Sequence, residues 1–261
     1  MTFSLSKVTA LIAAIFSISY SYSAGPTVLT ESLRPNDLVT GSIKIGRRTI
    51  VLPAGNWQLV VKSDKSSSTE GSSQAPTIMT LYFQEVRDKR LSRGLEIAAT
   101  TFSGKMNWFD DPCKTKGDSY WLDDRKRGTN DQFCIRVGYM SGVVDGARGD
   151  AFQSWARDIK ANAIGYSPEM PFVSVVRYTA YDYLRMSISF DPFPAGILPS
   201  QNPARQFNEW QGQTVSQRQK HAKFYDSLVD WAPKFATAVR RDFENDEYLT
   251  SGDFGEPILP N

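Results

Sequence analysis

The chain has 261 residues, a formal net charge of +2 at pH 7, and hydrophobic and charged fractions of 41% and 22%. This composition is that of an ordinary globular protein and excludes a disordered chain. The near-neutral balance argues against nucleic acid as the main partner, because such binding needs a basic surplus. The length allows one large domain or two small ones, and we expect a single domain.

Residues 1–23 have the layout of a secretory signal peptide. Lys7 precedes an apolar run, and small residues follow at Ser21 and Ser23. The run is about half of the length that a membrane-spanning helix needs. We predict cleavage after Ser23 and an exported mature domain over residues 24–261, periplasmic or secreted, with no transmembrane span. A weak membrane anchor or a buried N-terminal helix is the alternative interpretation.

Short β-branched and aromatic runs follow, bounded by turns that are rich in Gly, Pro and Asn. Residues 42–45 and 49–52 predict a hairpin, and residues 57–62 predict a further strand. Trp57, which opens that strand, can be a binding platform or a core residue. We favour the core, because a large aromatic side chain stabilises a fold strongly when it is buried.

The serine-rich stretch at residues 63–76 contains almost nothing to bury and predicts a mobile loop within the domain. Residues 78–86 alternate apolar and polar side chains with a period of two, which predicts a half-buried strand. We expect residues 87–94 to form a charged turn and residues 95–102 to form the return strand.

Cys113 and Cys134 are the only cysteines in the chain. In an oxidising compartment we expect them to pair, and closing this loop would stabilise the fold by ~3 kcal/mol on the chain-entropy model. A redox-active or metal-binding pair is the alternative. However, redox pairs are usually spaced Cys-x-x-Cys, and zinc would need further Cys or His ligands. We therefore predict a structural disulfide, with no metal site and no cofactor.

The loop over residues 113–134 is dense in carboxylates, which raises the hypothesis of a calcium site. Basic residues nearly cancel this charge, and the spacing of an EF-hand is not met. We interpret the segment as a solvated charged loop that Tyr120 and Trp121 fasten to the body, with a strand near Cys134. The aspartates in question are Asp118, Asp123, Asp124 and Asp131.

Asp150 is the predicted N-cap of a helix over residues 150–164, because apolar side chains follow it at helical spacing and Gly165 can end it. Residues 172–178 are apolar on both faces, which predicts a central strand. Residues 183–190 alternate cleanly and predict a half-buried strand.

Three tyrosines, Tyr178, Tyr181 and Tyr183, gather near the turn between these two strands. Tyrosine combines an apolar ring with a polar hydroxyl, so the cluster is a possible binding surface for a sugar or a peptide. Packing within the β-rich body is the alternative, and it is the interpretation that we favour.

Residues 215–245 show the strongest helical pattern, with apolar residues at steps of three and four and charged residues on the other side. Pro233 predicts a kink or two helices placed end to end. The apolar face can lie on a membrane, lie in a partner's groove or cover a sheet, and we favour the sheet. Its residues are Phe224, Leu228, Trp231, Phe235, Val239 and Phe243.

The fold that we predict is α+β. A single antiparallel sheet of about six to eight strands is covered on one face by the helices at residues 150–164 and 215–245. The sequence holds one histidine, His221, and no Gly-x-Ser-x-Gly motif, which argues against most catalytic triads.

The leading functional hypothesis is a non-catalytic binding or structural component of the bacterial cell envelope, with an envelope protein or a glycan as partner. One alternative is a carboxylate-dependent glycan or peptide hydrolase, because that chemistry needs only two acidic side chains. Asp110, Asp111 and Asp182 are its candidate residues. A second alternative is a peripheral membrane-surface protein that uses the helix at residues 215–245.

Overall fold

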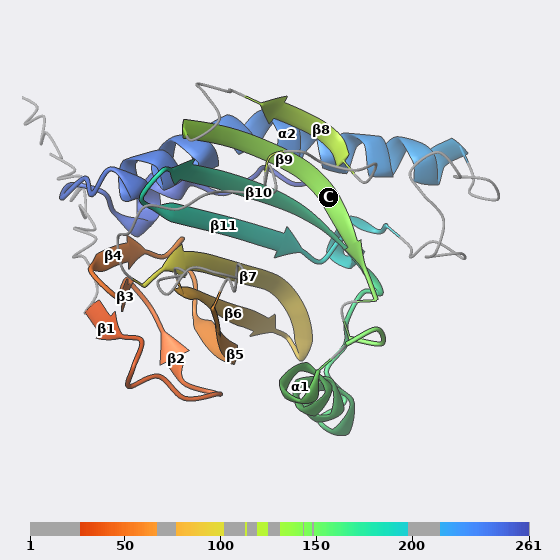
Figure 1. Cartoon of the computed structure of the whole chain (residues 1–261). Coiled ribbons are helices and arrows are strands. Elements are labelled where there is room, and N and C mark those ends of the chain that lie inside the picture. Colours follow the sequence, from red (N-terminus) through yellow and green to blue (C-terminus); the bar gives the residue numbers. More distant parts are fainter. Residues whose placement is uncertain are drawn as a thin grey trace, which may run out of the picture.

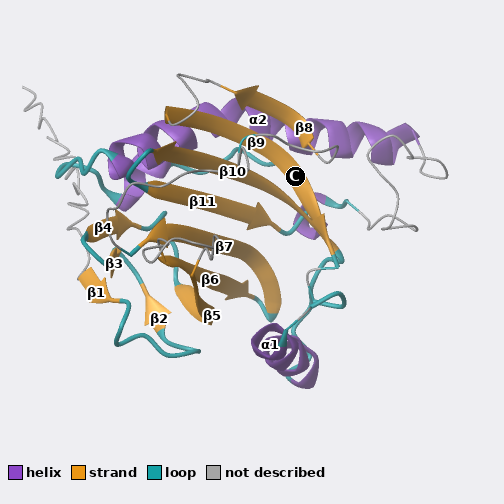
Figure 2. Ribbon diagram, in the orientation of Figure 1, coloured by secondary structure: helices purple, strands orange, loops and turns teal. Residues whose placement is uncertain are grey.

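The structure is a computed structural model that describes residues 27–66, 77–101, 113, 119–124, 131–142, 144–147, 149–197 and 215–260. Within these residues the chain forms a large sheet, a small sheet and two α-helices (Figures 1 and 2). The predicted signal peptide lies outside the described residues. So does most of the predicted serine-rich loop, whose first four residues, 63–66, continue a strand instead.

The large sheet has eight strands, and every neighbouring pair is antiparallel. In spatial order they are β2 (Leu38–Val39), β5 (Trp57–Ser66), β6 (Thr77–Arg87), β7 (Arg90–Thr100), β11 (Tyr183–Phe190), β10 (Glu169–Thr179), β9 (Asp131–Ser141) and β8 (Ser119–Asp124). The predicted α+β class and strand number are confirmed. So are the position of β10 inside the sheet and the extent of β11.

The small sheet contains β1 (Thr27–Leu29), β3 (Ser42–Ile45) and β4 (Arg48–Val51), with β3 in the middle. The hairpin between β3 and β4 is the predicted one. Its turn needs Gly46, which has φ 56° and whose Cβ, if present, would lie 1.8 Å from the carbonyl oxygen of Thr101. Ile43, Ile45 and Ile50 are fully buried in the main core, as is Trp57 at the start of β5.

The turn between β6 and β7 is shorter than the predicted turn at residues 87–94. Asp88 and Lys89 both have positive φ angles, 50° and 57°, and β7 begins directly after them. A two-residue turn of this kind matches the twist of antiparallel strands. The basic residues that suggested a long turn belong to the strand, where Arg90 and Arg93 form ion pairs.

The segment between the two cysteines is not only a charged loop, because it contains the edge strand β8, which pairs with β9. Tyr120 of β8 stacks on Tyr225, with ring centroids 4.8 Å apart, and its hydroxyl donates to Asp226 at 3.0 Å. The prediction that Tyr120 fastens this segment to the body is therefore confirmed. Residues 114–118 and 125–130 lie outside the described residues.

The helix α2 (Val215–Phe243) is one continuous helix, although Pro233 lies inside it. Of the two predicted outcomes, a kink or two helices placed end to end, the second does not occur. Proline removes one backbone donor from the helix, and buried residues on both sides of it, such as Trp231 and Phe235, hold the helix against the core. Trp231 also donates its indole N–H to the carbonyl of Phe254 at 3.0 Å.

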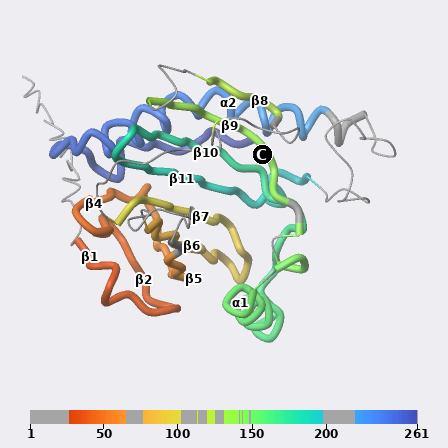
Figure 3. The backbone as a smooth tube through the Cα atoms, viewed as in Figure 1, coloured from red at the N-terminus to blue at the C-terminus, as the bar shows by residue number. Residues whose placement is uncertain are grey.

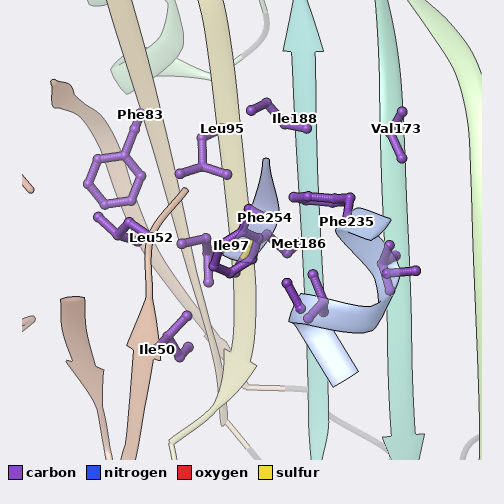
Figure 4. Close-up of a cluster of buried hydrophobic side chains, with 14 of the residues drawn as sticks. Ile50, Leu52, Phe83, Leu95, Ile97, Val173, Met186, Ile188, Phe235 and Phe254 are labelled. Atoms are coloured by element: carbon purple, nitrogen blue, oxygen red, sulfur yellow. The ribbon is translucent and has the colours of Figure 1, made fainter. Parts of the chain in front are cut away.

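The apolar side of α2 covers one face of the large sheet. Its predicted apolar residues are all buried in the main core, together with side chains of β6, β7, β10 and β11 (Figure 4). Phe235 of α2 packs there among Val173, Met186 and Ile188. These six side chains are therefore used inside the protein, which is the interpretation that we favoured. Two short 3-10 helices, Phe193–Ala195 and Ser251–Phe254, complete the elements of the described chain.

The helix α1 (Asp150–Ala161) lies against the opposite face of the sheet, whereas we expected both helices on one face. It contacts Tyr82 and Gln84, which alternate along β6 with Leu81 and Phe83 of the α2 side. Figures 1 and 3 show α1 at the far end of β6 and β7, well separated from α2. The helix takes this position because its apolar and aromatic side packs on residues of this face of the sheet.

The ends of α1 also differ from the prediction. Asp150 is the first helical residue rather than the N-cap, a position that Gly149 takes with φ 83°. The helix ends before residue 162, because Ala163 adopts the left-handed conformation with φ 51°.

Candidate binding groove

A row of polar side chains crosses the face of the sheet that α1 contacts. Strand register places Tyr82, Glu96, Ser187, Ser174 and Arg136 side by side on β6, β7, β11, β10 and β9. Side chains paired in this way point to the same face of a sheet. We call these five residues the polar row, and they face away from α2.

A groove of about 470 Å³ lies on this face, between the sheet and α1. Small-molecule sites have volumes of roughly 300–1,000 Å³ and mostly apolar linings with a few polar groups. This lining has that character. Its aromatic residues include Tyr82, Phe152, Trp155 and Phe172, its thioethers are Met140 and Met170, and its polar residues are Gln84, Glu96, Ser187 and Ser189.

Two side chains of α1 fix this helix as a wall of the groove. Phe152 packs edge-to-face on Tyr82, with ring centroids 4.7 Å apart. The indole N–H of Trp155 donates to Oε1 of Gln84 at 2.7 Å. The amide of Gln84 in turn donates to Gln58 of β5 at 2.7 Å. Because each contact joins α1 to strands of the sheet, the wall and the floor form one packed unit.

The floor of the groove is closely packed at Gly94 of β7. A Cβ atom at this position would lie 2.7 Å from the hydroxyl oxygen of Ser189 on the neighbouring strand. Both residues line the groove. A side chain at position 94 would therefore crowd the hydroxyl of Ser189 on the floor of the groove.

The electrostatics of the groove are dominated by one ion pair. Glu96 pairs with Arg185, and their side chains are 19% and 37% exposed. Burial, reinforced by the nearby Glu96 carboxylate, raises the pKa of Tyr82 to about 12. The phenol of Tyr82 is therefore protonated at neutral pH.

Two of the three tyrosines are buried in the body, in line with the interpretation that we favoured over a binding surface. Tyr178 and Tyr183 are 1% and 6% exposed, because they pair across the β10–β11 hairpin and pack with the two cysteines. Only Tyr181, at 57% exposure, faces solvent. The three side chains therefore share no solvent-facing surface.

Cys113 and Cys134 lie at disulfide-bonding distance, with Cα atoms 5.7 Å apart. Cys134 pairs with Val176 on the face of the polar row, two residues along β9 from Arg136. The cysteines, Tyr178 and Tyr183 belong to one buried cluster. This cluster closes the end of the groove face that lies away from α1.

Of the three candidate catalytic carboxylates, Asp182 alone lies among the described residues, and it is held by its own partners. Asp182 forms an ion pair with Arg48 and accepts a hydrogen bond from the hydroxyl of Thr100 at 2.6 Å. It lies at the β10–β11 turn and does not line the groove. Asp110 and Asp111 are outside the described residues.

A buried acid joins α2 to the small sheet. Asp242 is 3% exposed in the last turn of α2 and accepts a hydrogen bond from the backbone N–H of Val51 at 3.1 Å. Arg48 donates to the carbonyl of Phe243 at 2.7 Å. Burial raises the pKa of Asp242 to about 7, against the lowering effects of Val51 and Arg48. These hydrogen bonds hold the C-terminal end of α2 against the small sheet.

Sequence reasoning missed the residues of the groove, although part of the signal was present. The polar members of β6 and β11, such as Tyr82 and Ser187, stand at alternate positions to the apolar residues. A search for strands whose outward positions include aromatic residues would have noted Tyr82 and Phe172. Only strand order brings them together with α1, and the order was not predicted.

No protein-family model, no curated protein and no solved structure matches this chain. Across the described parts of the chain, no helix has the length and apolar character needed to cross a membrane. Nor does any group of three His, Cys, Asp or Glu side chains among those residues lie close enough to hold a metal ion. The interpretation of the groove therefore rests on its own geometry.

Proposed function

We propose that the protein is a non-catalytic binding protein that holds a small, mainly apolar molecule in the groove between α1 and the sheet. The observation that carries the proposal is a groove of about 470 Å³ with an aromatic wall that is packed onto its floor. Preformed, mostly apolar cavities of this size are the usual sites of small ligands. The groove favours such a ligand over the envelope protein or glycan that the sequence alone suggested.

The chemistry of the lining supports binding rather than catalysis. A general acid or base works best when its pKa is near the operating pH. Tyr82 has a pKa of about 12, and Glu96 is held in an ion pair by Arg185. The residues that line the groove include neither histidine nor cysteine. Each of these features favours a site that holds its ligand unchanged.

We further propose that the protein acts after export, in the periplasm or outside the cell, as a component of the bacterial envelope. The support is the signal-like pattern of residues 1–23 and the pairing distance of Cys113 and Cys134. Disulfides persist in oxidising compartments and are rare in the cytosol. Sequencing the N-terminus of the exported protein tests this proposal, and an intact N-terminus in the cytosol would contradict it.

The test of the groove is a titration of the purified protein with N-phenyl-1-naphthylamine, an uncharged probe that fluoresces in apolar sites. We expect saturable binding that Ser187→Trp abolishes, because a tryptophan at the centre of the floor fills the groove. The matched control is Thr49→Trp, which adds the same side chain at an exposed position of β4. Absence of binding to the unaltered protein, or equal loss in both variants, would refute the groove as a site.

A further inference from the structure

We infer that the groove selects an uncharged ligand, whose apolar body lies against the aromatic wall and whose hydroxyl or amide group reaches the polar row. This inference rests on the proposed function, because it names the charge and the polar group of the molecule that the groove binds.

An anionic ligand would meet the wrong charge. Among the described residues that line the groove, Glu96 is the only one with a charged side chain. Two arginines of the same sheet face already have partners. Arg185 pairs with Glu96, and the guanidinium of Arg136 lies over the ring of Phe172 at 5.2 Å from its centroid. An anion in the groove would lose its hydration without gaining a free counterion.

A cationic ligand would find its counterion already occupied. The carboxylate of Glu96 is paired with Arg185 and accepts a hydrogen bond from the hydroxyl of Tyr82. A cation would have to displace the guanidinium, which would leave Arg185 without its partner. Breaking a partly buried ion pair by removing one partner is costly, because the other charge stays uncompensated. The ion pair therefore leaves no free counterion in the groove for a cationic ligand.

The serine hydroxyls supply hydrogen bonds that a neutral group can use. Ser187 shares a hydrogen bond with Ser174 at 2.7 Å. Ser189 is 4% exposed, lines the groove and makes a long hydrogen bond of 3.4 Å to the carbonyl of Gly94. A hydroxyl both donates and accepts. A ligand hydroxyl or amide can therefore pair with Ser187 and Ser189 and leave the ion pair between Glu96 and Arg185 intact.

The first experiment compares matched probes on the unaltered protein. N-phenyl-1-naphthylamine is neutral, and 8-anilino-1-naphthalenesulfonate is the same ring system with a sulfonate. Diphenylhexatriene and its trimethylammonium derivative form the corresponding neutral and cationic pair. We expect the neutral member of each pair to bind about tenfold tighter than the charged one, since one uncompensated charge is worth at least that factor.

The second experiment uses variants that unbalance the ion pair. Glu96→Gln leaves Arg185 unpaired and should raise the affinity for the sulfonate probe about tenfold, with little change for its neutral match. Arg185→Gln leaves Glu96 unpaired and should do the same for the trimethylammonium probe. The double variant removes both charges and should restore the preference for neutral probes. A purely structural role of the pair would weaken all four probes alike.

The outcomes separate this inference from the proposed function. If no probe binds the unaltered protein, the groove is not a site and both proposals fail. If neutral and charged probes bind equally and Ser187→Trp abolishes both, the groove binds ligands but the inference on charge is refuted. Thermal unfolding of each variant shows whether it folds. If one single variant does not fold, the other single variant and the double variant still decide the result.

Discussion

The two faces of the large sheet differ in what covers them. The face towards α2 buries Leu81, Ile97 and Met186, each at 0% exposure, in a continuous apolar core. The opposite face carries the polar row, an ion pair and a groove that α1 only partly covers. The same strands build both faces, because successive side chains of a strand point to opposite sides. One face is built for stability, and the other retains room for a ligand.

This division has an energetic consequence. Burial of apolar surface is the main favourable term in folding, and it is concentrated on the α2 face. The groove face contributes the disulfide cluster at one end and the α1 contacts at the other. Changes on the α2 face should therefore act on the free energy of unfolding, whereas changes in the groove should act mainly on ligand binding.

The largest expected effect is that of Phe235→Ala. Phe235 is fully buried between α2 and the sheet (Figure 4). Truncating such a ring loses its burial and leaves a cavity, which should lower the free energy of unfolding by about 4 kcal/mol. Urea unfolding followed by circular dichroism measures this. The comparison is Phe152→Ala in α1, a half-buried ring on the groove face, which should cost less than half as much. Equal costs would contradict the division between the faces.

The second effect concerns the end of the groove face that the cysteines close. Removing the bond between Cys113 and Cys134, which are 21 positions apart, should lower the free energy of unfolding by about 3 kcal/mol on the chain-entropy model. Urea unfolding with and without a reductant measures the loss. The control is the double variant Cys113→Ala with Cys134→Ala, which should be insensitive to reductant. An unaltered protein that is equally insensitive would show that the pair does not stabilise the fold.

Much of the fold could be predicted because local patterns match what tertiary packing requires. The alternation over residues 183–190 gave β11 its bounds, since the inner residues Leu184 and Met186 enter the core. The predicted turn at residues 87–94 was wrong because charged residues there belong to a strand. Arg93, for example, pairs with Glu85 on the neighbouring strand. At Pro233 the predicted division into two helices does not occur, because packing on both sides preserves one helix.

The groove could not be predicted, because its residues come from strands that only the sheet order brings together. Glu96 and Ser187 are paired neighbours on β7 and β11, although a long stretch of chain separates them. The burial of two tyrosines also depends on strand pairing. The sequence shows only that Tyr178 and Tyr183 lie near one turn. Strand register pairs them and places both in a buried cluster.

The third effect tests the end of the α2 face through pH. Burial raises the pKa of Asp242 to about 7, from an ordinary value of 3.8. The folded state therefore binds a proton more tightly than the unfolded state, so the stability that this group contributes is fully present below about pH 4 and is lost as the pH rises through 7. Lowering the pH from 8 to 5 should raise the free energy of unfolding by about 2 kcal/mol, since the slope reaches ~1.4 kcal/mol per pH unit. Urea unfolding at the two pH values measures this.

The control for this prediction is Asp242→Asn, which should remove the rise between pH 8 and 5. Glu85, in contrast, has a pKa that hydrogen bonds and ion pairing with Arg93 and Arg87 lower, against the effect of its burial. Its contribution is present above its unfolded pKa and is lost only as the pH falls below that range. The two groups therefore act in different pH windows. An unchanged rise in Asp242→Asn would show that another group is responsible.

The smallest effect compares one indole hydrogen bond on each face. Trp155→Phe removes the bond to Gln84 that ties α1 to the sheet, and Trp231→Phe removes the bond to Phe254 beneath α2. Each should lower the free energy of unfolding by about 1 kcal/mol, the usual net value of a hydrogen bond. Only Trp155→Phe should also weaken the neutral probe and speed hydrogen exchange in α1, because only that bond fixes the wall of the groove. If Trp231→Phe weakens the probe to the same extent, the two faces are coupled, and ligand binding depends on the whole core rather than on α1.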